Sequence, residues 1–218
     1  MGEGFITRKG GGVNVNDATA FDVFYGYGTS FKEIFNHPQS GTYTVPSNVT
    51  KIMVEIWGGG GGSAATGSSL ADFGGGAGGY SRKIITTNPG DTFSFTVGDR
   101  GEGGSGSCAA NGKNGGQSSF SGTDANNNSI NMTANGGLRH SSGGTGGTAS
   151  GGDINMQGQS RDGTKGGAAA FGGVGGGVGD FTNGETPGGG AKGRGTGGCN
   201  AGYNGGYGSV IIRELSLF

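Results

Sequence analysis

Short runs of β-branched and aromatic residues recur along the chain, and turn residues bound each of them. Within these runs apolar and polar positions alternate, as at Ile52, Val54 and Ile56 or at Phe93 and Phe95. Alternation with a period of two over so few residues indicates a β-strand with one buried face. The pattern predicts strands at 42–45, 51–57, 81–87, 92–97, 117–121, 129–134, 153–157 and 209–214.

Two turn signals separate the first four of these runs. Pro46-Ser47-Asn48 lies between the first and second, and Asn88-Pro89-Gly90-Asp91 lies between the third and fourth. Proline, asparagine, aspartate and glycine are the residues that tight turns favour. The sequence therefore predicts a hairpin at each place.

Glycine dominates the rest of the chain. Of the 218 residues 59 are glycine, and 51 of these lie between Gly58 and Gly208. Collagen needs glycine at every third position together with abundant proline, whereas this chain has four prolines and an uninterrupted run from Gly58 to Gly62. Disorder is the other common state of such a composition. The alternating strands argue against it, because a disordered chain has no buried face to encode.

The glycine-rich connections between the strands are about 15 to 45 residues long, which is unusual for loops without structure of their own. Polyglycine II helices explain them: these have three residues per turn and no internal hydrogen bonds, so they must bond to neighbours. A three-residue spacing is visible at Gly173, Gly176 and Gly179, and again at Gly202, Gly205 and Gly208. We predict an all-β, β-sandwich-like domain whose long glycine-rich loops form packed polyglycine II helices.

Residues 1–39 differ from the glycine-rich β-domain expected at 40–218, since they hold seven of the eighteen phenylalanines and tyrosines. The stretch from Ser30 to Phe35 is interpreted as a helical turn. A segment this short rarely folds alone. It is expected either to dock on a partner or to pack its aromatics under the β-domain. The residues predicted to attach the protein to a fibre are Phe21, Phe24, Tyr25, Phe31 and Phe35.

Charge and motifs exclude several classes of function. The net charge is −1 and charged residues make up 13%, so bulk electrostatics attracts neither nucleic acid nor a membrane. No run approaches 18 apolar residues, and the first residues lack the pattern of a secretion signal. Cys108 and Cys199 are too few for a disulfide framework, and whether they pair stays open.

Candidate chemistry is sparse. Gly101-Glu102-Gly103-Gly104-Ser105-Gly106 matches a dinucleotide fingerprint, but no helix follows it and the glycine density produces such matches by chance. Neither His37 nor His140 has a histidine or cysteine at metal-ligand spacing. We therefore expect no catalysis, no cofactor and no metal site.

A few bulky or charged residues stand among the glycines. Binding surfaces are drawn from loop positions of this kind, where aromatic, polar and charged side chains make adaptable contacts. The alternative is that the aromatic members fill gaps at the ends of the glycine helices. The candidate receptor-contact residues are Phe73, Arg139, His140, Phe171, Asp180, Phe181, Lys192, Arg194 and Tyr203.

An ordered set of segments resembles the glycine-rich domain of many bacteriophage tail-fibre and receptor-binding proteins. The set comprises 41–46, 54–62, Gly78-Gly79-Tyr80, 88–92, 96–98 and 208–212. Distal adhesins of T-even-like phages are similar in having a sandwich of polyglycine II helices with receptor recognition on loops at its tip. This chain differs in its more prominent strands and less regular glycine spacing, and 1–39 matches no known attachment domain.

The resemblance implies a component of a phage tail, or of a phage-tail-like particle, that is made in the bacterial host cytoplasm and adheres to the bacterial surface without catalysis. Its partners would be a surface polysaccharide or outer-surface protein and other tail or fibre proteins, in a homotrimer or as a cap on a trimeric fibre. No contact with nucleic acid or insertion into a membrane is expected. The alternatives are a structural virion or fibre protein without a receptor, and an ice-binding polyglycine protein.

Overall fold

The computed structural model describes residues 27–35, 38–65, 73–105, 110–139, 141, 143–176, 183–193 and 201–217. Expectations for residues 1–26, for Cys108 and for Cys199 lie outside this part of the chain. Within it every element longer than one turn is a β-strand, and none is a helix long and apolar enough to cross a membrane. The predicted all-β class is confirmed.

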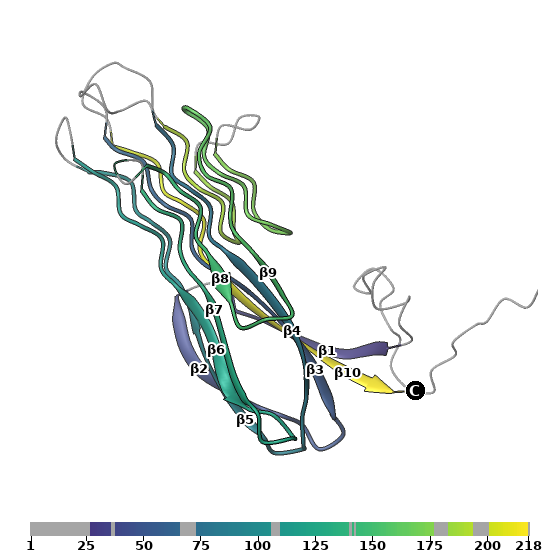
Figure 1. The fold of residues 1–218 in the computed structure, drawn as a ribbon. Coiled ribbons are helices and arrows are strands. Elements are labelled where there is room, and N and C mark those ends of the chain that lie inside the picture. The colour runs from purple at the N-terminus through teal and green to yellow at the C-terminus, as the bar shows by residue number, and fades with distance from the viewer. Residues whose placement is uncertain are drawn as a thin grey trace, which may run out of the picture.

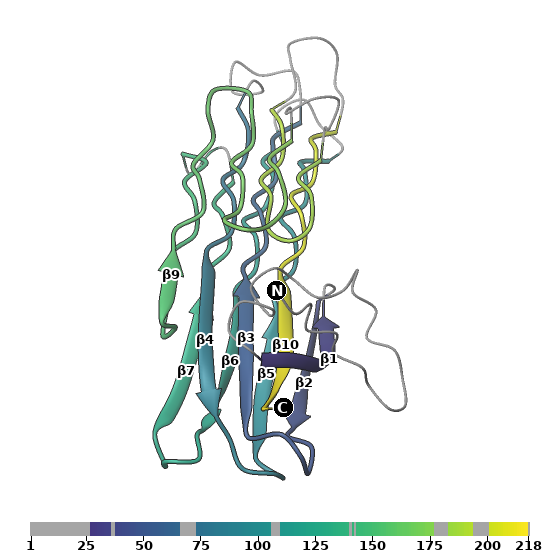
Figure 2. The same cartoon turned by 90° about the vertical axis from the view of Figure 1, so that its right-hand side faces the viewer.

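Two antiparallel five-stranded sheets lie against each other at one end of the molecule (Figures 1 and 2). The first sheet has, in spatial order, β1 (Tyr27–Phe35), β10 (Ser209–Leu217), β3 (Lys51–Trp57), β4 (Tyr80–Thr86) and β9 (Ile154–Met156). The second has β2 (Gln39–Thr44), β5 (Thr92–Val97), β6 (Ser118–Thr123), β7 (Ser129–Ala134) and β8 (Ala149–Ser150). All eight predicted strands are present, and β1 and β8 were not predicted.

Both predicted hairpins are wrong, because each turn passes from one sheet to the other. β2 pairs with β5, and β3 pairs with β4. The turn at 46–48 therefore joins β2 to a strand of the opposite sheet, and the turn at 88–91 does the same for β4 and β5. Turn residues signal a reversal but not the partner of each strand. The partner follows from which apolar faces must meet.

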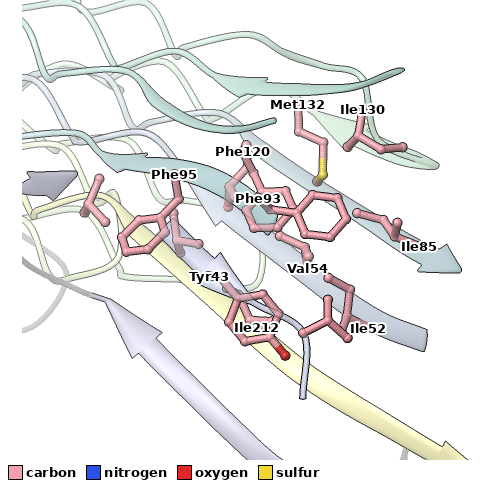
Figure 3. Packing of buried hydrophobic residues seen from close by; sticks show 14 of the residues in the cluster. Tyr43, Ile52, Val54, Ile85, Phe93, Phe95, Phe120, Ile130, Met132 and Ile212 are labelled. Atoms are coloured by element: carbon pink, nitrogen blue, oxygen red, sulfur yellow. The ribbon is translucent and has the colours of Figure 1, made fainter. Parts of the chain in front are cut away.

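The core between the sheets is built from the alternating positions identified in the sequence. Phe93, Phe95 and Val97 of β5 point inward and are buried, whereas the residues between them are exposed. Figure 3 shows Phe93 and Phe120 side by side, with ring centroids 5.2 Å apart, and Val54 and Ile212 of the opposite sheet facing them. At about 25 cal/mol per Å² of apolar area, burial of these side chains is the main stabilising term of the sandwich.

The segment read as a helical turn, Ser30 to Phe35, instead belongs to strand β1. It pairs with β10 from Tyr27 to Phe35, with an irregularity between Thr29 and Phe31. Aromatic and β-branched residues favour a pleated strand once a free sheet edge is available. Phe35 stacks on Phe95 with ring centroids 4.2 Å apart and packs against the core. For this residue the structure has the second arrangement expected from the sequence, in which the aromatic packs under the β-domain.

Beyond the sheets the chain continues as extended glycine-rich segments that run side by side to the far end of the molecule (Figure 1). Eight of them are direct continuations of strands, and four form a further layer between β9 and β10. The described parts of these twelve segments are 58–65, 73–79, 98–105, 110–117, 135–139, 143–148, 157–163, 164–169, 172–176, 183–187, 188–193 and 201–208. We call this assembly the glycine bundle.

Segment 58–65 shows the hydrogen-bond geometry of a threefold helix. The N–H groups of Gly58 and Gly61 donate to segment 73–79, those of Gly59, Gly62 and Ala65 to 110–117, and those of Gly60 and Ser63 to 201–208. These seven N···O distances are 2.9 to 3.0 Å. Successive donors thus point to three different neighbours and return to the first after three residues, as predicted for polyglycine II.

For one of the two series seen in the sequence, the three-residue spacing has a direct structural meaning. In the other, Gly173 and Gly176 donate to two different segments, and Gly179 lies outside the described residues. Gly202, Gly205 and Gly208 all donate to segment 98–105, through Gly104, Gly101 and Gly98 respectively. The bundle is therefore more regular than the uneven glycine spacing suggested. Buried alanines, such as Ala77 and Ala191, also occupy positions inside the central segments.

Three segments lie at the centre of the bundle and each contacts six others. Segment 58–65 donates to three neighbours and accepts from 98–105, 135–139 and 188–193. Segments 73–79 and 188–193 are enclosed in the same way, and these three segments hydrogen-bond to one another. Hexagonal packing of this kind satisfies buried backbone groups in every direction, which a flat sheet does only within its plane.

Glycine is required where backbones approach this closely. A Cβ atom on Gly60 would overlap the carbonyl oxygen of Gly189, and one on Gly75 would overlap that of Gly61. Neither obstacle is a flexible side chain, so neither can move aside. The glycine content is thus a packing requirement of the central segments.

Candidate binding site at the tip of the glycine bundle

The far end of the glycine bundle carries the side chains that the glycine-rich interior lacks. We define the tip as the described residues that lie farther from the two sheets than the hydrogen bond from Gly61 N–H to the carbonyl of Gly76. The central segment 73–79 begins there with Phe73, whose side chain is exposed, whereas residues 74–79 are all buried. Every neighbouring segment also ends or turns at the tip, so the fold gathers chain positions that are far apart in sequence.

Phe73 and Arg161 form the best-defined side-chain contact of the tip. The Arg161 guanidinium carbon lies 3.9 Å from the centroid of the Phe73 ring, within the range of a cation–π contact. Arg161 Nε donates to the carbonyl of Gly143 at 2.9 Å, while its Nη1 is buried without a hydrogen-bond partner in the described structure. Burial of the group lowers the pKa of Arg161 from its ordinary value.

A second polar group lies on segments 110–117 and 135–139. The backbone N–H of Arg139 donates to Asn114 Oδ1 at 2.9 Å, and Arg139 Nη1 donates to the carbonyl of Gly112 at 3.4 Å. Beside it Lys113 Nζ and Glu102 Oε2 form an exposed ion pair at 2.6 Å. That hydrogen bond lowers the pKa of Glu102 and raises the pKa of Lys113.

The turn at 161–165 adds two more charges. Asp162 and Lys165 exchange backbone hydrogen bonds of 3.1 and 2.9 Å across it. Next to this turn the N–H of Gly193 donates to the carbonyl of Thr164 at 2.7 Å, which brings Lys192 to the same side. The described tip thus has cations at Lys113, Arg139, Arg161, Lys165 and Lys192 against acids at Glu102 and Asp162. It is locally positive in a chain whose net charge is −1.

The structure brings together four of the nine residues proposed from the sequence as receptor contacts: Phe73, Arg139, Lys192 and Tyr203. The backbone of half-buried Tyr203 is fixed by Ser63, whose N–H donates to the Tyr203 carbonyl and whose Oγ accepts the Tyr203 N–H. The remaining candidates His140, Asp180, Phe181 and Arg194 lie outside the described residues. Sequence reasoning missed Arg161 and Lys165, although the Arg161-Asp162-Gly163-Thr164-Lys165 turn between glycine segments was a visible signal.

Phe171 lies at the other end of the bundle, where it meets the sheets. Its ring is 74% exposed and its centroid is 5.3 Å from that of Tyr80 in β4. The adjacent carbonyl of Ala170 accepts a 2.7 Å hydrogen bond from Trp57 Nε1. Phe171 therefore does not share a surface with the tip residues, and the two sets cannot act as one contact patch.

The chemistry available at the tip is set by its side chains and by the backbone groups at the segment ends. No group of three or more His, Cys, Asp or Glu side chains able to hold a metal occurs in the described part of the chain. What the tip offers is one exposed aromatic ring, several cations and many backbone N–H and C=O groups at segment ends. Groups of these kinds can contact a partner by stacking, charge and hydrogen bonding.

A family model described as a glycine-rich domain matches residues 36–214. This match spans β2 to β10 and the whole glycine bundle. The chain belongs to the glycine-rich domain family. No curated protein matches the chain.

For this member of the glycine-rich domain family, the matched range covers both the framework and the described tip. The matched range includes the strands and the glycine segments that continue them. Glycines in those segments are fixed by backbone contact. The side chains at the tip are not subject to this backbone packing requirement.

Proposed function

We propose that this protein is a tail-fibre or tail-tip component of a phage or phage-tail-like particle and binds a receptor on the bacterial surface by non-catalytic adhesion. The observation that carries the proposal is that the glycine segments which form the framework are separate in space from the candidate contact residues at the tip. Three enclosed glycine segments form a stiff body, and Phe73 and the surrounding cations stand at its exposed end. The resemblance of the chain to phage receptor-binding domains gives the biological setting.

The architecture suits adhesion under load. Each central segment is held by six neighbours, so the tip cannot bend away from the sandwich without breaking many buried hydrogen bonds at once. The contact area at the end of one bundle is small, and a single site is therefore expected to bind weakly. Display of several copies, as a homotrimer or as caps on a fibre, would supply avidity.

The test is adsorption to cells. Purified full-length protein, fluorescently labelled, is expected to bind some strains of a bacterial panel and to protect those strains from the particle that carries it. A variant with Phe73→Ala should adsorb less strongly, whereas Phe171→Ala, at the opposite end of the bundle, should adsorb as the native protein does. If the native protein adsorbs to no strain and blocks no infection, a structural role without a receptor replaces the proposal.

A further inference from the structure

Phe73 lies at the tip end of a central segment of the glycine bundle. It opens the central segment 73–79, which is surrounded by six other segments. Four of these six carry a cationic residue at the level of the tip, namely Arg139, Arg161, Lys165 and Lys192. The fold therefore places one exposed aromatic ring within a partial ring of positive charge.

Backbone contacts confirm that these positions adjoin Phe73. The N–H of Gly74 donates to the carbonyl of Gly163, and a Cβ on Gly74 would come within 2.6 Å of the Lys165 carbonyl oxygen and 2.7 Å of that of Ala191. Lys165 and Lys192 thus flank the residue that follows Phe73. On another side, the Arg161 guanidinium lies over the Phe73 ring.

Three of these cations form no ion pair with the described residues. In the described structure, Arg161, Lys165 and Lys192 take part in none of the three ion pairs, which join Lys83 to Asp153, Lys113 to Glu102 and Arg213 to Glu55. Arg161 Nη1 is moreover buried and has no hydrogen-bond acceptor there. A buried donor on a charged group costs stability unless an acceptor is supplied. An external anion would supply the charge partner that these three cations lack among the described residues.

We propose that the tip binds an anionic glycan, with a phosphate or carboxylate group held by Arg161, Lys165 and Lys192 and a sugar ring packed on the exposed part of Phe73. This inference rests on the proposed adhesive function and names the class of receptor. Guanidinium and ammonium groups are the usual ligands of phosphate and carboxylate in proteins. A nucleic acid is disfavoured because the described tip offers only a few cations in a chain of net charge −1, whereas nucleic-acid binding needs many phosphate contacts.

The test compares a variant that removes two positive charges at the tip with a control that removes one positive charge elsewhere, in two assays. Lys165→Gln/Lys192→Gln is the test variant, and Lys51→Gln, at the start of β3, is a charge control away from the tip. The first assay measures binding to multivalent conjugates of mannose 6-phosphate against mannose, of sialyllactose against lactose, and to a single-stranded DNA oligonucleotide. The second measures adsorption to the strains that bind the native protein.

We expect the native protein to prefer the anionic member of a sugar pair, and the double variant to bind it about tenfold more weakly, the effect of roughly one charge-assisted contact. Binding should weaken as salt rises, and Lys51→Gln should stay within about twofold of native. Native-like adsorption by the double variant, or equal binding to charged and neutral sugars, would overturn the anionic glycan and point to a neutral or protein receptor. Preference for DNA would overturn it in favour of nucleic acid. Loss of adsorption by the native protein to every strain would instead remove the proposed function, and the sugar pairs would still decide the glycan inference.

Discussion

The Tyr80 hydroxyl donates a 2.7 Å hydrogen bond to Glu55 Oε1 across the β3–β4 pair, on the face of the first sheet that points away from the sandwich core. Both residues are buried. On the other side, Arg213 Nε of β10 lies 3.4 Å from Glu55 Oε2. A carboxylate withdrawn from water thus depends on a phenol and a guanidinium from the two adjacent strands.

Removing the hydroxyl group of Tyr80 should therefore destabilise the fold. Tyr80→Phe keeps the ring that packs on Trp57 and leaves one oxygen of a buried carboxylate without its donor. The expected loss in the free energy of unfolding is about 1.5 to 3 kcal/mol. Chemical denaturation measures it. Tyr43→Phe is the comparison, because Tyr43 donates a longer bond of 3.2 Å to Glu214 and should cost less. Equal losses of stability in the two variants would show that the short hydrogen bond of Tyr80 contributes no more than the longer one of Tyr43.

The same pair predicts a decline of stability in alkali. Burial first, and then the charge and hydrogen bond of Glu55, raise the pKa of Tyr80 well above its ordinary value of 10.0. A raised folded-state pKa stabilises the native state fully below the unfolded pKa, and that contribution is lost as pH rises toward the folded pKa. Above pH 10, Tyr80 should thus add a fall of about 1.4 kcal/mol per pH unit. The difference between native protein and Tyr80→Phe, followed by denaturation from pH 8 to 11, isolates this effect from other tyrosines. A constant difference across that range would contradict it.

The strands were predictable from the sequence because their signal is local. In β5, Phe93, Phe95 and Val97 alternate with exposed residues, and the structure keeps that alternation. In β3 alternation was a poorer guide, since Met53, Glu55 and Trp57 are buried as well as Ile52, Val54 and Ile56. For Trp57 the cause is a tertiary one: Ala169 and Ala170 of the further glycine layer pack on Trp57 and Tyr80. No residue pattern within β3 itself predicts that layer.

The candidate site was predictable only in part, for a related reason. Phe73 and Lys192 stood out as bulky residues among glycines, and both lie at the tip. Phe171 stood out equally, yet the chain turns back at 169–172 and leaves it beside Tyr80 at the other end of the bundle. Spacing in a glycine segment indicates which neighbour each residue faces. It does not indicate at which end of the bundle a turn will lie, because that depends on where the other segments stop.

A single methyl group in a central segment should disrupt the bundle. Gly60→Ala places a Cβ against the carbonyl of Gly189, and neither backbone can move without breaking further hydrogen bonds. The expected cost is about 3 kcal/mol or more, the upper part of the range for overpacking. Gly163→Ala is the control, since its Cβ meets no atom within 4 Å but its φ is +55°. Left-handed strain alone should cost about 1 to 2 kcal/mol there. Thermal unfolding measures both, and a Gly60→Ala variant as stable as Gly163→Ala would contradict the role of central glycines.

Asp153 predicts a small loss of stability in acid. Its Oδ1 lies 2.8 Å from Lys83 Nζ, and its Oδ2 accepts the N–H of Ile84 at 3.0 Å. Burial alone would raise the pKa of Asp153, but the bonds from Lys83 and Ile84 outweigh it and lower the pKa below its ordinary value.

A lowered folded-state pKa stabilises the native state above the unfolded pKa, and the benefit is lost as pH falls through the folded pKa. Asp153→Asn should therefore be less stable than native at pH 7 by about 0.5 kcal/mol, a modest value because the pair is partly exposed. The gap should shrink in acid, from about pH 5 downward. Urea denaturation at pH 7, 5 and 3 compares the two proteins, and a gap that persists at pH 3 would rule out ionisation as its cause.

Phe171 combines high exposure with a left-handed backbone, and the two features can be separated by substitution. Its φ is 50°, a region in which residues with a Cβ lose about 1 to 2 kcal/mol relative to glycine. Phe171→Ala loses the contact of the ring with Tyr80 and keeps the strain, so it should be less stable than native by about 1 kcal/mol. Phe171→Gly loses the same contact but relieves the strain, and should be close to native in stability. Calorimetric melting of the three proteins tests the order. If Phe171→Ala is as stable as Phe171→Gly, the backbone of residue 171 is not strained. The exposed ring alone would then account for the contribution of Phe171 to stability.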